Sequence, residues 1–220
     1  MKAPLPANEA ERLRMLGLYH ILDTAEEAAF DDITRLGAIV CDTPICLISL
    51  IDDKRQWFKS RVGLSATETS RDIAFCAHAI LQDDVFEVED ALLDQRFAEN
   101  PLVTSAPHIR FYSGAPLTVA SGIALGTLCV IDHEPRQLTT QQTEGLKILR
   151  QMVVTQLELR RALGDLQLLN QVLPMCAWCR SIRDDSGAWQ PLDKYVAGAF
   201  SVTHGICPQC SKALHPGLPK

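Results

Sequence analysis

The hydrophobic and polar positions divide the chain into three segments, and the first of them mixes helical and strand patterns. Apolar residues recur at helical spacing over residues 8–18 and 26–40, which predicts two amphipathic helices. A dense run of β-branched residues and leucines at 45–51 and an alternating stretch at 56–62 predict two strands of a hairpin, which turns at the acidic pair 52–53.

The rest of the first segment continues this mixture. Residues 72–81 predict a short helix with Asp72 as its N-cap, and residues 85–88 predict a strand. A further pair of strands is predicted at 110–115 and 123–131, and the second of these is almost entirely apolar, which is typical of a central strand. Strands predominate in the middle of the segment and helices at its ends, so the predicted fold class is α+β.

The second segment, residues 140–173, predicts one long helix, because only two glycines interrupt it. Thr139 with Gln142, or Thr140 one position later, offers a capping box at its start. A heptad-like stripe favours pairing with a second helix, and it consists of Leu149, Met152, Gln156, Leu159, Leu163, Leu166, Asn170 and Leu173. Residues 146–157 are expected to pack on the preceding sheet, and the asparagine of the stripe would fix the register. We therefore expect a homodimer.

The third segment begins with a proline and carries two Cys-x-x-Cys pairs, Cys176 with Cys179 and Cys207 with Cys210. Two intervening residues allow both sulfurs of a pair to bind one ion, and four thiolates complete a closed tetrahedral zinc shell. The predicted role of the zinc is structural, because the segment is too small to form a sufficient core. Two alternatives stay open. His204 could replace one thiolate, and the first pair could be a thioredoxin-like redox pair, although the βαβ setting of that chemistry is missing.

Composition and charge narrow the function classes. The 220 residues carry a formal net charge of -6, so a general electrostatic attraction to nucleic acid or to anionic lipid is disfavoured. The most apolar stretch, residues 38–51, is interrupted by polar residues and is shorter than the roughly 18 apolar residues that a membrane span needs. Charges near the N-terminus argue against a signal peptide, and eight cysteines without an export signal indicate a reducing compartment. We therefore expect a cytoplasmic protein that does not bind membranes.

Five stretches of the first segment carry a resemblance to a known family, and they occur in the order ISLIDDKRQWFKSRVGL, ETSRDIAFCAHAI, DQRFAENPLV, IRFYSGAPL and LGTLCVID. With these motifs, residues 5–160 resemble a bacterial GAF domain of the sensory type. The resemblance implies a six-stranded antiparallel sheet with helices packed on its faces and a small-molecule pocket on one side. Domains of this family precede histidine kinases, cyclase-like outputs or transcriptional regulators, and most of them are binding modules.

The cysteine-rich segment resembles a small module that recurs at the C-terminus of bacterial two-component sensors and receiver proteins. It shares the pattern Leu-Pro-x-Cys-x-Trp-Cys-x-x-Ile-Arg, an aspartate-glycine turn and the sequence His-Gly-Ile-Cys-Pro-x-Cys. The turn, at residues 184–187, predicts a small hairpin. The expected organisation is a GAF domain at 1–140, a signalling and dimerisation helix at 141–173 and a four-cysteine zinc module at 174–220, with a two-component signalling protein as a partner.

The pocket that the resemblance implies has candidate residues on one helix and in neighbouring segments. An arginine together with an aromatic ring and a histidine could hold an anionic or planar ligand. The candidates for ligand binding are Arg71, Asp72, Phe75, Cys76, His78, Arg110 and Tyr112. In the alternative interpretation Asp72 caps a helix, Arg71 pairs with a neighbouring acid, and Phe75 belongs to the core. Cys76 and His78 diverge by about 200° on a helix and so form no metal pair. A covalent bilin is disfavoured, because the histidine does not directly follow the cysteine.

No glycine-rich phosphate loop, kinase-like ATP motif, pair of catalytic carboxylates or Gly-x-Ser-x-Gly elbow is found in the sequence. We therefore expect a sensor or adaptor that is not an enzyme and that signals when a small-molecule ligand changes helix pairing. Two other classes stay open. One GAF branch reduces free methionine sulfoxide with cysteines, and Cys41, Cys46, Cys76 and Cys129 are available, although three of them lie in patterns typical of buried positions. The other class is a zinc-ribbon regulator that binds nucleic acid through the slightly basic tail.

Overall fold

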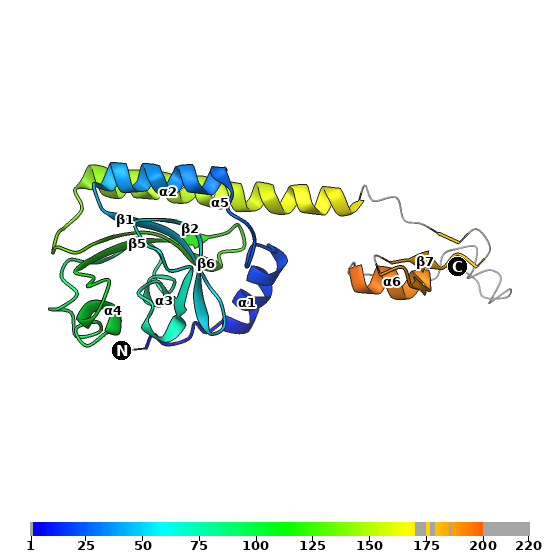
Figure 1. Ribbon diagram of the computed structural model, residues 1–220, viewed down its shortest axis with the longest axis horizontal. Coiled ribbons are helices and arrows are strands. Elements are labelled where there is room, and N and C mark those ends of the chain that lie inside the picture. The colour runs from blue at the N-terminus through cyan, green and yellow to red at the C-terminus, as the bar shows by residue number, and fades with distance from the viewer. Residues whose placement is uncertain (1, 170–174, 177–178, 185, 200–220) are drawn as a thin grey trace, which may run out of the picture. The chain divides into compact units, whose positions relative to one another are not determined.

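The structure is a computed structural model, and it describes residues 2–169, 175–176, 179–184 and 186–199. These residues belong to two compact units, Met1–Leu166 and Gln167–Lys220, which are described separately. The first unit contains a six-stranded sheet with helices on both faces, and the second contains a small hairpin and a helix (Figure 1).

Every neighbouring pair of strands in the large sheet is antiparallel, and the strand order is β3-β2-β1-β6-β5-β4. This order confirms the α+β class and the six-stranded antiparallel sheet that the GAF resemblance implies. The central strands β1 and β6 are buried along almost their whole length, because both of their faces are covered. The strands are β1 (Ile45–Ile51), β2 (Arg55–Val62), β3 (Glu68–Ser70), β4 (Phe86–Val88), β5 (Phe111–Thr118) and β6 (Ala124–Asp132).

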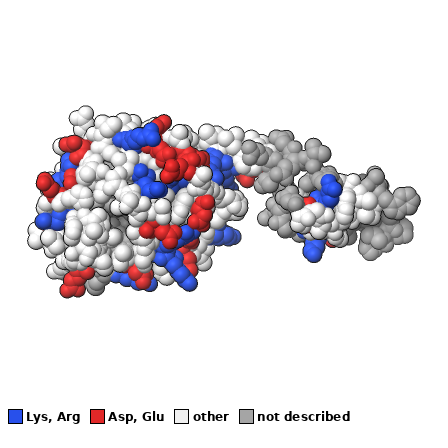
Figure 2. Space-filling model, viewed as in Figure 1, with Lys and Arg blue, Asp and Glu red and all other residues white. Residues whose placement is uncertain are grey.

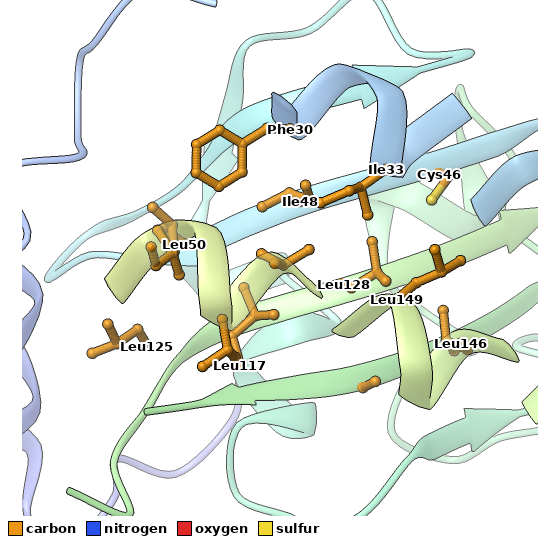
Figure 3. Close-up of a cluster of buried hydrophobic side chains, with 14 of the residues drawn as sticks. Phe30, Ile33, Cys46, Ile48, Leu50, Leu117, Leu125, Leu128, Leu146 and Leu149 are labelled. Carbon is orange, nitrogen blue, oxygen red and sulfur yellow. The ribbon is translucent and has the colours of Figure 1, made fainter. Parts of the chain in front are cut away.

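One face of the sheet is covered by α2 (Ala28–Cys41) and the first part of α5 (Thr140–Leu169), and α1 (Glu9–Leu18) contributes Leu16 to the same core. Alternate residues of a strand point to opposite faces, so Cys46, Ile48 and Leu50 of β1 belong to this core while their neighbours do not. Figure 3 shows these side chains pointing toward Phe30 and Ile33 of α2 and toward Leu146 and Leu149 of α5.

The opposite face carries short helices and long loops. These helices are η1 (Arg71–Ile73), α3 (Cys76–Ala79) and α4 (Pro101–Thr104), and they pack with the other set of alternating strand residues. The helix predicted at 72–81 is shorter than expected, because Ala74 takes an extended conformation with φ −76° and ψ 124° after η1. The predicted cap is corrected as well. The N-cap is Ser70 and not Asp72. The backbone N–H of Asp72, in the first turn of η1, donates a hydrogen bond to the Ser70 side chain at 3.3 Å.

The long helix α5 begins with the predicted capping box. The Thr139 N–H donates to Gln142 Oε1 at 3.0 Å, and the Gln142 N–H donates to Thr139 Oγ1 at 3.2 Å. Gly145 then allows α5 to lie close to α2, because a Cβ atom at this position would be 2.6 Å from Val40 Cγ1.

The predicted heptad stripe of α5 divides between two faces of the helix. Leu149 is buried against the sheet together with Leu146 and Val153. The half-exposed members of the stripe are Met152, Leu159, Leu163 and Leu166, whereas Asn170 and Leu173 lie outside the described residues. Within the described part of the chain, no helix combines the length and apolar character that crossing a membrane requires.

A buried lysine links the sheet to both long covering helices. Lys59 of β2 has a fully buried side chain, and its Nζ donates to Glu27 Oε1 at 2.7 Å and to the Ala25 carbonyl at 2.6 Å. Glu27 directly precedes α2 and also accepts a hydrogen bond from Arg160 Nε of α5 at 3.0 Å. Burial raises the pKa of Glu27, but hydrogen bonds from Lys59 and Arg160 outweigh burial and lower this pKa. The three charges therefore form one network that joins β2, α2 and α5.

The second unit contains β7 (Ile182–Arg183), β8 (Trp189–Gln190) and α6 (Leu192–Ala199). β7 and β8 pair in antiparallel fashion, which confirms the predicted hairpin. At its turn, Asp184 Oδ1 accepts a hydrogen bond from the Ala188 N–H at 3.0 Å, and Gly187 takes a φ of +84°, which favours glycine. Asp185 of this turn lies outside the described residues.

Candidate functional site

A cavity of about 300 Å³ lies on the sheet face that α3 covers. Its mouth includes the exposed residues Ser65 and Ala106. None of the described residues that line the cavity is a Lys, Arg, His, Asp or Glu, so its shape and chemistry suit an uncharged and largely apolar ligand. Its apolar walls include Leu47, Phe58, Phe75, Leu102, Ile109 and Ile131.

One wall of the cavity carries two polar atoms that lack a hydrogen-bond partner among the described residues. Gln56 and Thr69 are direct partners across β2 and β3, and both line the cavity. Gln56 is 5% exposed, and within the described part of the chain neither its Oε1 nor Thr69 Oγ1 has a hydrogen-bond partner. A buried polar atom without a partner costs free energy, about 1–3 kcal/mol. A ligand that donates hydrogen bonds to these two oxygens would remove this cost.

A second polar group of residues lies where α3 meets the sheet. The Tyr112 hydroxyl donates to Cys76 Sγ at 3.2 Å, and the sulfurs of Cys76 and Cys129 are 3.7 Å apart. The Ser49 and Thr127 hydroxyls, 3.0 Å apart, also contact this group. Cys76 and Tyr112 line the cavity, so this cluster of thiols and hydroxyls forms part of its wall.

Gly114 makes room for the tyrosine in this cluster. A Cβ atom at position 114 would overlap the Tyr112 hydroxyl and would lie 2.7 Å from Tyr112 Cζ. Gly114 is also the residue of β5 that pairs directly with Cys129 of β6. The absence of a side chain at this position therefore allows the Tyr112 ring to lie over Gly114 and its hydroxyl to reach Cys76.

The structure brings together three of the residues predicted to bind ligand. Phe75, Cys76 and Tyr112 all line the cavity. The ring of Phe75 stacks on that of Phe97, with 3.9 Å between ring centroids and 9° between ring planes. This stack holds Phe75 in place, and the neighbouring rings of Phe75 and Tyr112, with 5.3 Å between their centroids, give the cavity one aromatic wall against which a planar ligand could pack.

The two candidate arginines do not line the cavity. Arg71 is 5% exposed, and its Nη1 donates to Glu9 Oε1 at 2.6 Å and to the Asp52 carbonyl at 3.0 Å. Arg110 donates through Nε and Nη2 to the two carboxylate oxygens of Asp90, at 2.9 and 2.7 Å. Both guanidinium groups are already paired with carboxylates, which corrects the expectation that they hold an anionic ligand in the pocket.

The remaining two candidates also lie away from the cavity lining. Asp72 is exposed and forms an ion pair with Lys2 at 2.8 Å. His78 is half-buried, and its ring contacts that of Phe97 edge-on, with 4.9 Å between centroids. Their places in the fold are explained by packing and by ion pairing rather than by a ligand in this cavity.

Gln56 and Thr69 are the site residues that the sequence prediction missed. A signal was present for Gln56, since it shares a strand face with Phe58 in the alternating stretch and is a polar residue at an inward-facing position. Thr69 had no comparable signal, because β3 has only three residues and all of them are polar, so the sequence shows no alternation of apolar and polar positions there.

Cys176 and Cys179, one of the two predicted zinc pairs, lie in a tight turn of the second unit. The Cys176 N–H donates to the Ser181 carbonyl at 2.8 Å. Hydrogen bonds from Ser181 and from Cys176 lower the pKa of Cys179 to about 7, which favours the thiolate that zinc binds. His204, Cys207 and Cys210 lie outside the described residues. Within the described part of the chain, no group of three or more His, Cys, Asp or Glu side chains is placed to hold a metal.

Charged side chains of opposite sign are interspersed on the face of the first unit that Figure 2 shows. Charges of opposite sign also pair closely in the first unit, since Arg55 lies 2.6 Å from Asp23, 2.7 Å from Glu68 and 3.3 Å from Asp52. A surface of this kind lacks the single-sign basic patch on which nucleic-acid binding depends, at least on the face shown.

Comparison with protein families and solved structures supports the resemblance seen in the sequence. Residues 25–160, more than half of the chain, match the family model described as GAF domain. The chain superposes with a TM-score of 0.51 and 14% identity on a domain of a protein described as a two-component sensor histidine kinase from Sinorhizobium meliloti, covering 66% of this chain and 99% of that domain. The GAF domain of an Acinetobacter phosphoenolpyruvate-protein phosphotransferase gives a TM-score of 0.50 and 17% identity, covering 73% and 99%. At these identities the two structures show the fold alone.

A cyclic di-GMP phosphodiesterase of Pseudomonas aeruginosa is similar in sequence. It is 47% identical over 133 residues, which are 60% of this chain and 23% of that relative. The chain therefore spans less than a quarter of the length of the relative that it matches. This relative is named for an enzymatic activity, and the finding contradicts the expectation that the protein is not an enzyme. That expectation is wrong.

Proposed function

The chain belongs to the GAF domain family, and we propose that its first unit is the sensing module of a protein that controls cyclic di-GMP. The phosphodiesterase relative supports the link to cyclic di-GMP, since the two sequences are 47% identical where they match. The cavity beneath α3 supports a sensing role, because it is the size of a small-molecule site and two polar atoms of its wall, Gln56 Oε1 and Thr69 Oγ1, lack hydrogen-bond partners among the described residues.

The unpartnered oxygens of Gln56 and Thr69 carry this proposal. They belong to the lining of a largely apolar cavity, and the ligand that fits them is small, uncharged and planar, with one edge that donates hydrogen bonds. Its rings would pack against the wall that Phe75 and Tyr112 form together, with 5.3 Å between their ring centroids, and its polar edge would meet the oxygens on the β2–β3 side.

We propose that this ligand regulates cyclic di-GMP turnover and is not the dinucleotide itself. Cyclic di-GMP carries two phosphodiester anions, and burial of an anion requires a cationic or hydrogen-bond-donating partner. None of the described residues that line the cavity is cationic, and Arg71 and Arg110 are engaged by Glu9 and Asp90. The regulator and the dinucleotide would therefore occupy different sites.

We propose that α5 transmits the signal by pairing with the α5 helix of a second copy. Support comes from the half-exposed side chains of Ile148, Met152, Leu159 and Leu166, which recur at heptad-like spacing on the side of α5 away from the sheet. Ligand binding would then shift the population of paired helices and change what the second unit presents to a two-component signalling protein.

We also propose that Cys176, Cys179, Cys207 and Cys210 hold a structural zinc ion. The described half of this set fits the ion, because a tight turn holds Cys176 and Cys179 within hydrogen-bonding range and favours the thiolate form of Cys179. When bound, the zinc would supply folding free energy to the second unit.

The ligand proposal is tested by thermal unfolding of the full chain in the presence of uncharged heteroaromatic compounds, with cyclic di-GMP as a separate arm. A compound that fills the cavity is expected to raise the melting temperature by binding the folded state. Substitution Gln56→Leu removes the acceptor and is expected to weaken binding about tenfold, which corresponds to the loss of a buried hydrogen bond.

The matched control is Gln141→Leu, which changes the same residue type at an exposed position of α5. It should leave the ligand-induced shift unchanged. Equal shifts for wild type and Gln56→Leu would place the ligand elsewhere, and a shift caused by cyclic di-GMP that Gln56→Leu abolishes would contradict the separation of regulator and dinucleotide.

A further inference from the structure

Two buried thiols meet at the wall of the cavity, and we propose that Cys76 and Cys129 form a redox-active pair that reduces organic hydroperoxides. The inference goes beyond the proposed function, because it requires no regulatory ligand. It rests on the place of Cys76 in the cavity wall, on the contact between the two sulfurs and on the hydroxyl groups around them.

The geometry brings a thiol of α3 against a thiol of β6. Their sulfurs are 3.7 Å apart, and a disulfide of about 2.05 Å requires that they approach by about 1.7 Å. Cys76 opens α3, a helix of only four residues that follows the extended residue Ala74. A displacement of this size is therefore confined to a short segment and leaves the strand that carries Cys129 in place.

The surroundings make the two thiols unequal. Burial raises the pKa of Cys76, but hydrogen bonds from Cys129, Ser49, Thr127 and Tyr112 outweigh burial and lower this pKa. The hydrogen bond to Cys76 and then burial raise the pKa of Cys129. Cys76 is thus the thiol of the pair that loses its proton more readily and acts as the nucleophile, and Cys129 is the neighbouring thiol that can resolve an oxidised Cys76.

The reaction has two steps whose atoms and electrons balance. The Cys76 thiolate attacks the terminal oxygen of a hydroperoxide, the O–O bond breaks, and an S–O bond forms, which gives a sulfenic acid and an alkoxide that leaves as the alcohol after taking up a proton. The Cys129 thiol then attacks the Cys76 sulfur, the S–O bond breaks, and water leaves as the disulfide forms. The two thiols lose two electrons in total, and the hydroperoxide gains them.

The cavity points to an organic hydroperoxide as the substrate. Most of the residues that line it together with Cys76 are apolar, with Phe58, Phe75 and Ile109 among them, and they suit the alkyl or aryl group of the peroxide. The Tyr112 hydroxyl lines the same cavity at 3.2 Å from Cys76 Sγ, where it can donate a hydrogen bond to the departing alkoxide.

Two other buried cysteines of the first unit provide a comparison within the same protein. Burial raises the pKa of Cys41 to about 11 and also raises the pKa of Cys46, so both stay protonated thiols. Neither lines the cavity. The proposal therefore predicts that oxidation distinguishes among cysteines that are equally hidden from solvent.

The test treats the reduced full-length chain with cumene hydroperoxide or with hydrogen peroxide and follows each cysteine by mass spectrometry. We expect a disulfide between Cys76 and Cys129, formed with the loss of two hydrogens, and oxidation of Cys76 about tenfold faster than that of Cys41 or Cys46. Cumene hydroperoxide should react faster than hydrogen peroxide at equal concentration. Faster reaction with hydrogen peroxide would overturn the assignment of the substrate, and the absence of the disulfide would overturn the pair.

Variants separate the two roles. Cys129→Ser should stop the reaction at a sulfenic acid on Cys76 that dimedone traps, whereas Cys76→Ser should leave Cys129 reduced. Gly114→Ala displaces the Tyr112 hydroxyl and should slow oxidation of Cys76, while Cys41→Ser should not. A melting curve for each variant shows whether that variant folds. If a variant does not fold, the mass-spectrometric mapping of oxidised cysteines on the wild-type chain still tests the proposal. Failure of this test leaves the Gln56→Leu ligand experiment unaffected, so the two proposals fail separately.

Discussion

Glu9 fastens the N-terminal helix to the sheet through two arginines that are almost completely buried. Its Oε1 accepts hydrogen bonds from Arg12 Nη2 at 2.8 Å and from Arg71 Nη1 at 2.6 Å. Arg12 is 1% exposed and also donates to the Ile51 carbonyl at 2.6 Å. A carboxylate that serves two buried guanidinium groups is costly to remove, because both would then lose part of their compensation for burial.

This arrangement predicts a pH-dependent contribution of Glu9 to stability. Burial raises the pKa of Glu9, but hydrogen bonds from Arg12 and Arg71 outweigh it and lower the pKa from 4.5 to about 2. The contribution is therefore complete above the unfolded pKa of 4.5 and is lost as pH falls toward about 2. Glu9→Gln is expected to lower the free energy of unfolding by roughly 2–4 kcal/mol at pH 7, with a smaller difference at pH 3.

Urea unfolding of both proteins at the two pH values measures this difference. Glu11→Gln is the matched control, because Glu11 lies exposed on the same helix. A difference between wild type and Glu9→Gln that stays constant between pH 7 and pH 3 would contradict the role assigned to the charge of Glu9.

The aromatic and sulfur residues of the site were predictable from the sequence, and the polar atoms of the site were not. Phe75, Cys76 and Tyr112 belong to motifs that the family resemblance places near a pocket. The sequence could not show that Arg110 is engaged in an ion pair and not in ligand binding, because its partner Asp90 is distant in sequence and only the fold brings the two residues together. Gln56 lies in an ordinary strand pattern, and its unpartnered oxygen becomes visible only when its neighbours are placed.

The apolar residues of helix α5 lie on two surfaces, one buried in the core of the first unit and one exposed. Its early residues Leu146, Leu149, Val153 and Leu157 are buried in the core of the first unit, whereas Leu159, Leu163 and Leu166 are half-exposed. The sequence predicted the helix and its capping box correctly. It placed Leu149 and Leu163 on one stripe, because an apolar pattern alone does not tell which face of a helix a sheet covers.

We expect Leu163→Glu to dissociate paired chains into single chains with little effect on the fold of the first unit. The substitution places a charge on the exposed apolar side of α5, where pairing is proposed, and far from the buried positions. Analytical ultracentrifugation measures the association, and the melting temperature of the first unit reports its fold. Gln151→Glu adds the same charge at another exposed position of α5 and should leave the association intact. Association unchanged by Leu163→Glu would rule out this face of the helix as the contact.

The whole molecule consists of two units with different predicted sources of stability. The first has two hydrophobic clusters, one on each face of its sheet, and these follow from the alternation and helical spacing that the sequence shows. The second has a two-stranded hairpin whose turn chemistry was also readable in the sequence. The shortened helix at α3 was not predicted, because the extended conformation of Ala74 depends on packing between η1 and the sheet.

Zinc removal is expected to unfold the second unit and to leave the first unit folded. Elemental analysis of the purified chain should give about one zinc per chain, as four thiolates predict. A strong chelator should remove the circular dichroism signal of the second unit while the thermal transition of the first persists. Cys176→Ser should reproduce the effect of the chelator, whereas Cys41→Ser should not. A folded second unit in metal-free protein would contradict the predicted zinc site.

Strand β2 carries side chains that make functional contacts on both faces of the sheet. Its Gln56 faces the cavity, and Lys59, three residues further along, lies on the opposite side and joins Glu27 and Arg160. Only Trp57 and Phe58 separate the two residues, so a displacement of one would be transmitted to the other through a short piece of backbone. Occupation of the cavity would thus be passed through the buried lysine to Glu27 and from there to Arg160 in the second half of α5, which would connect ligand binding on one side of the sheet with the helix on the other.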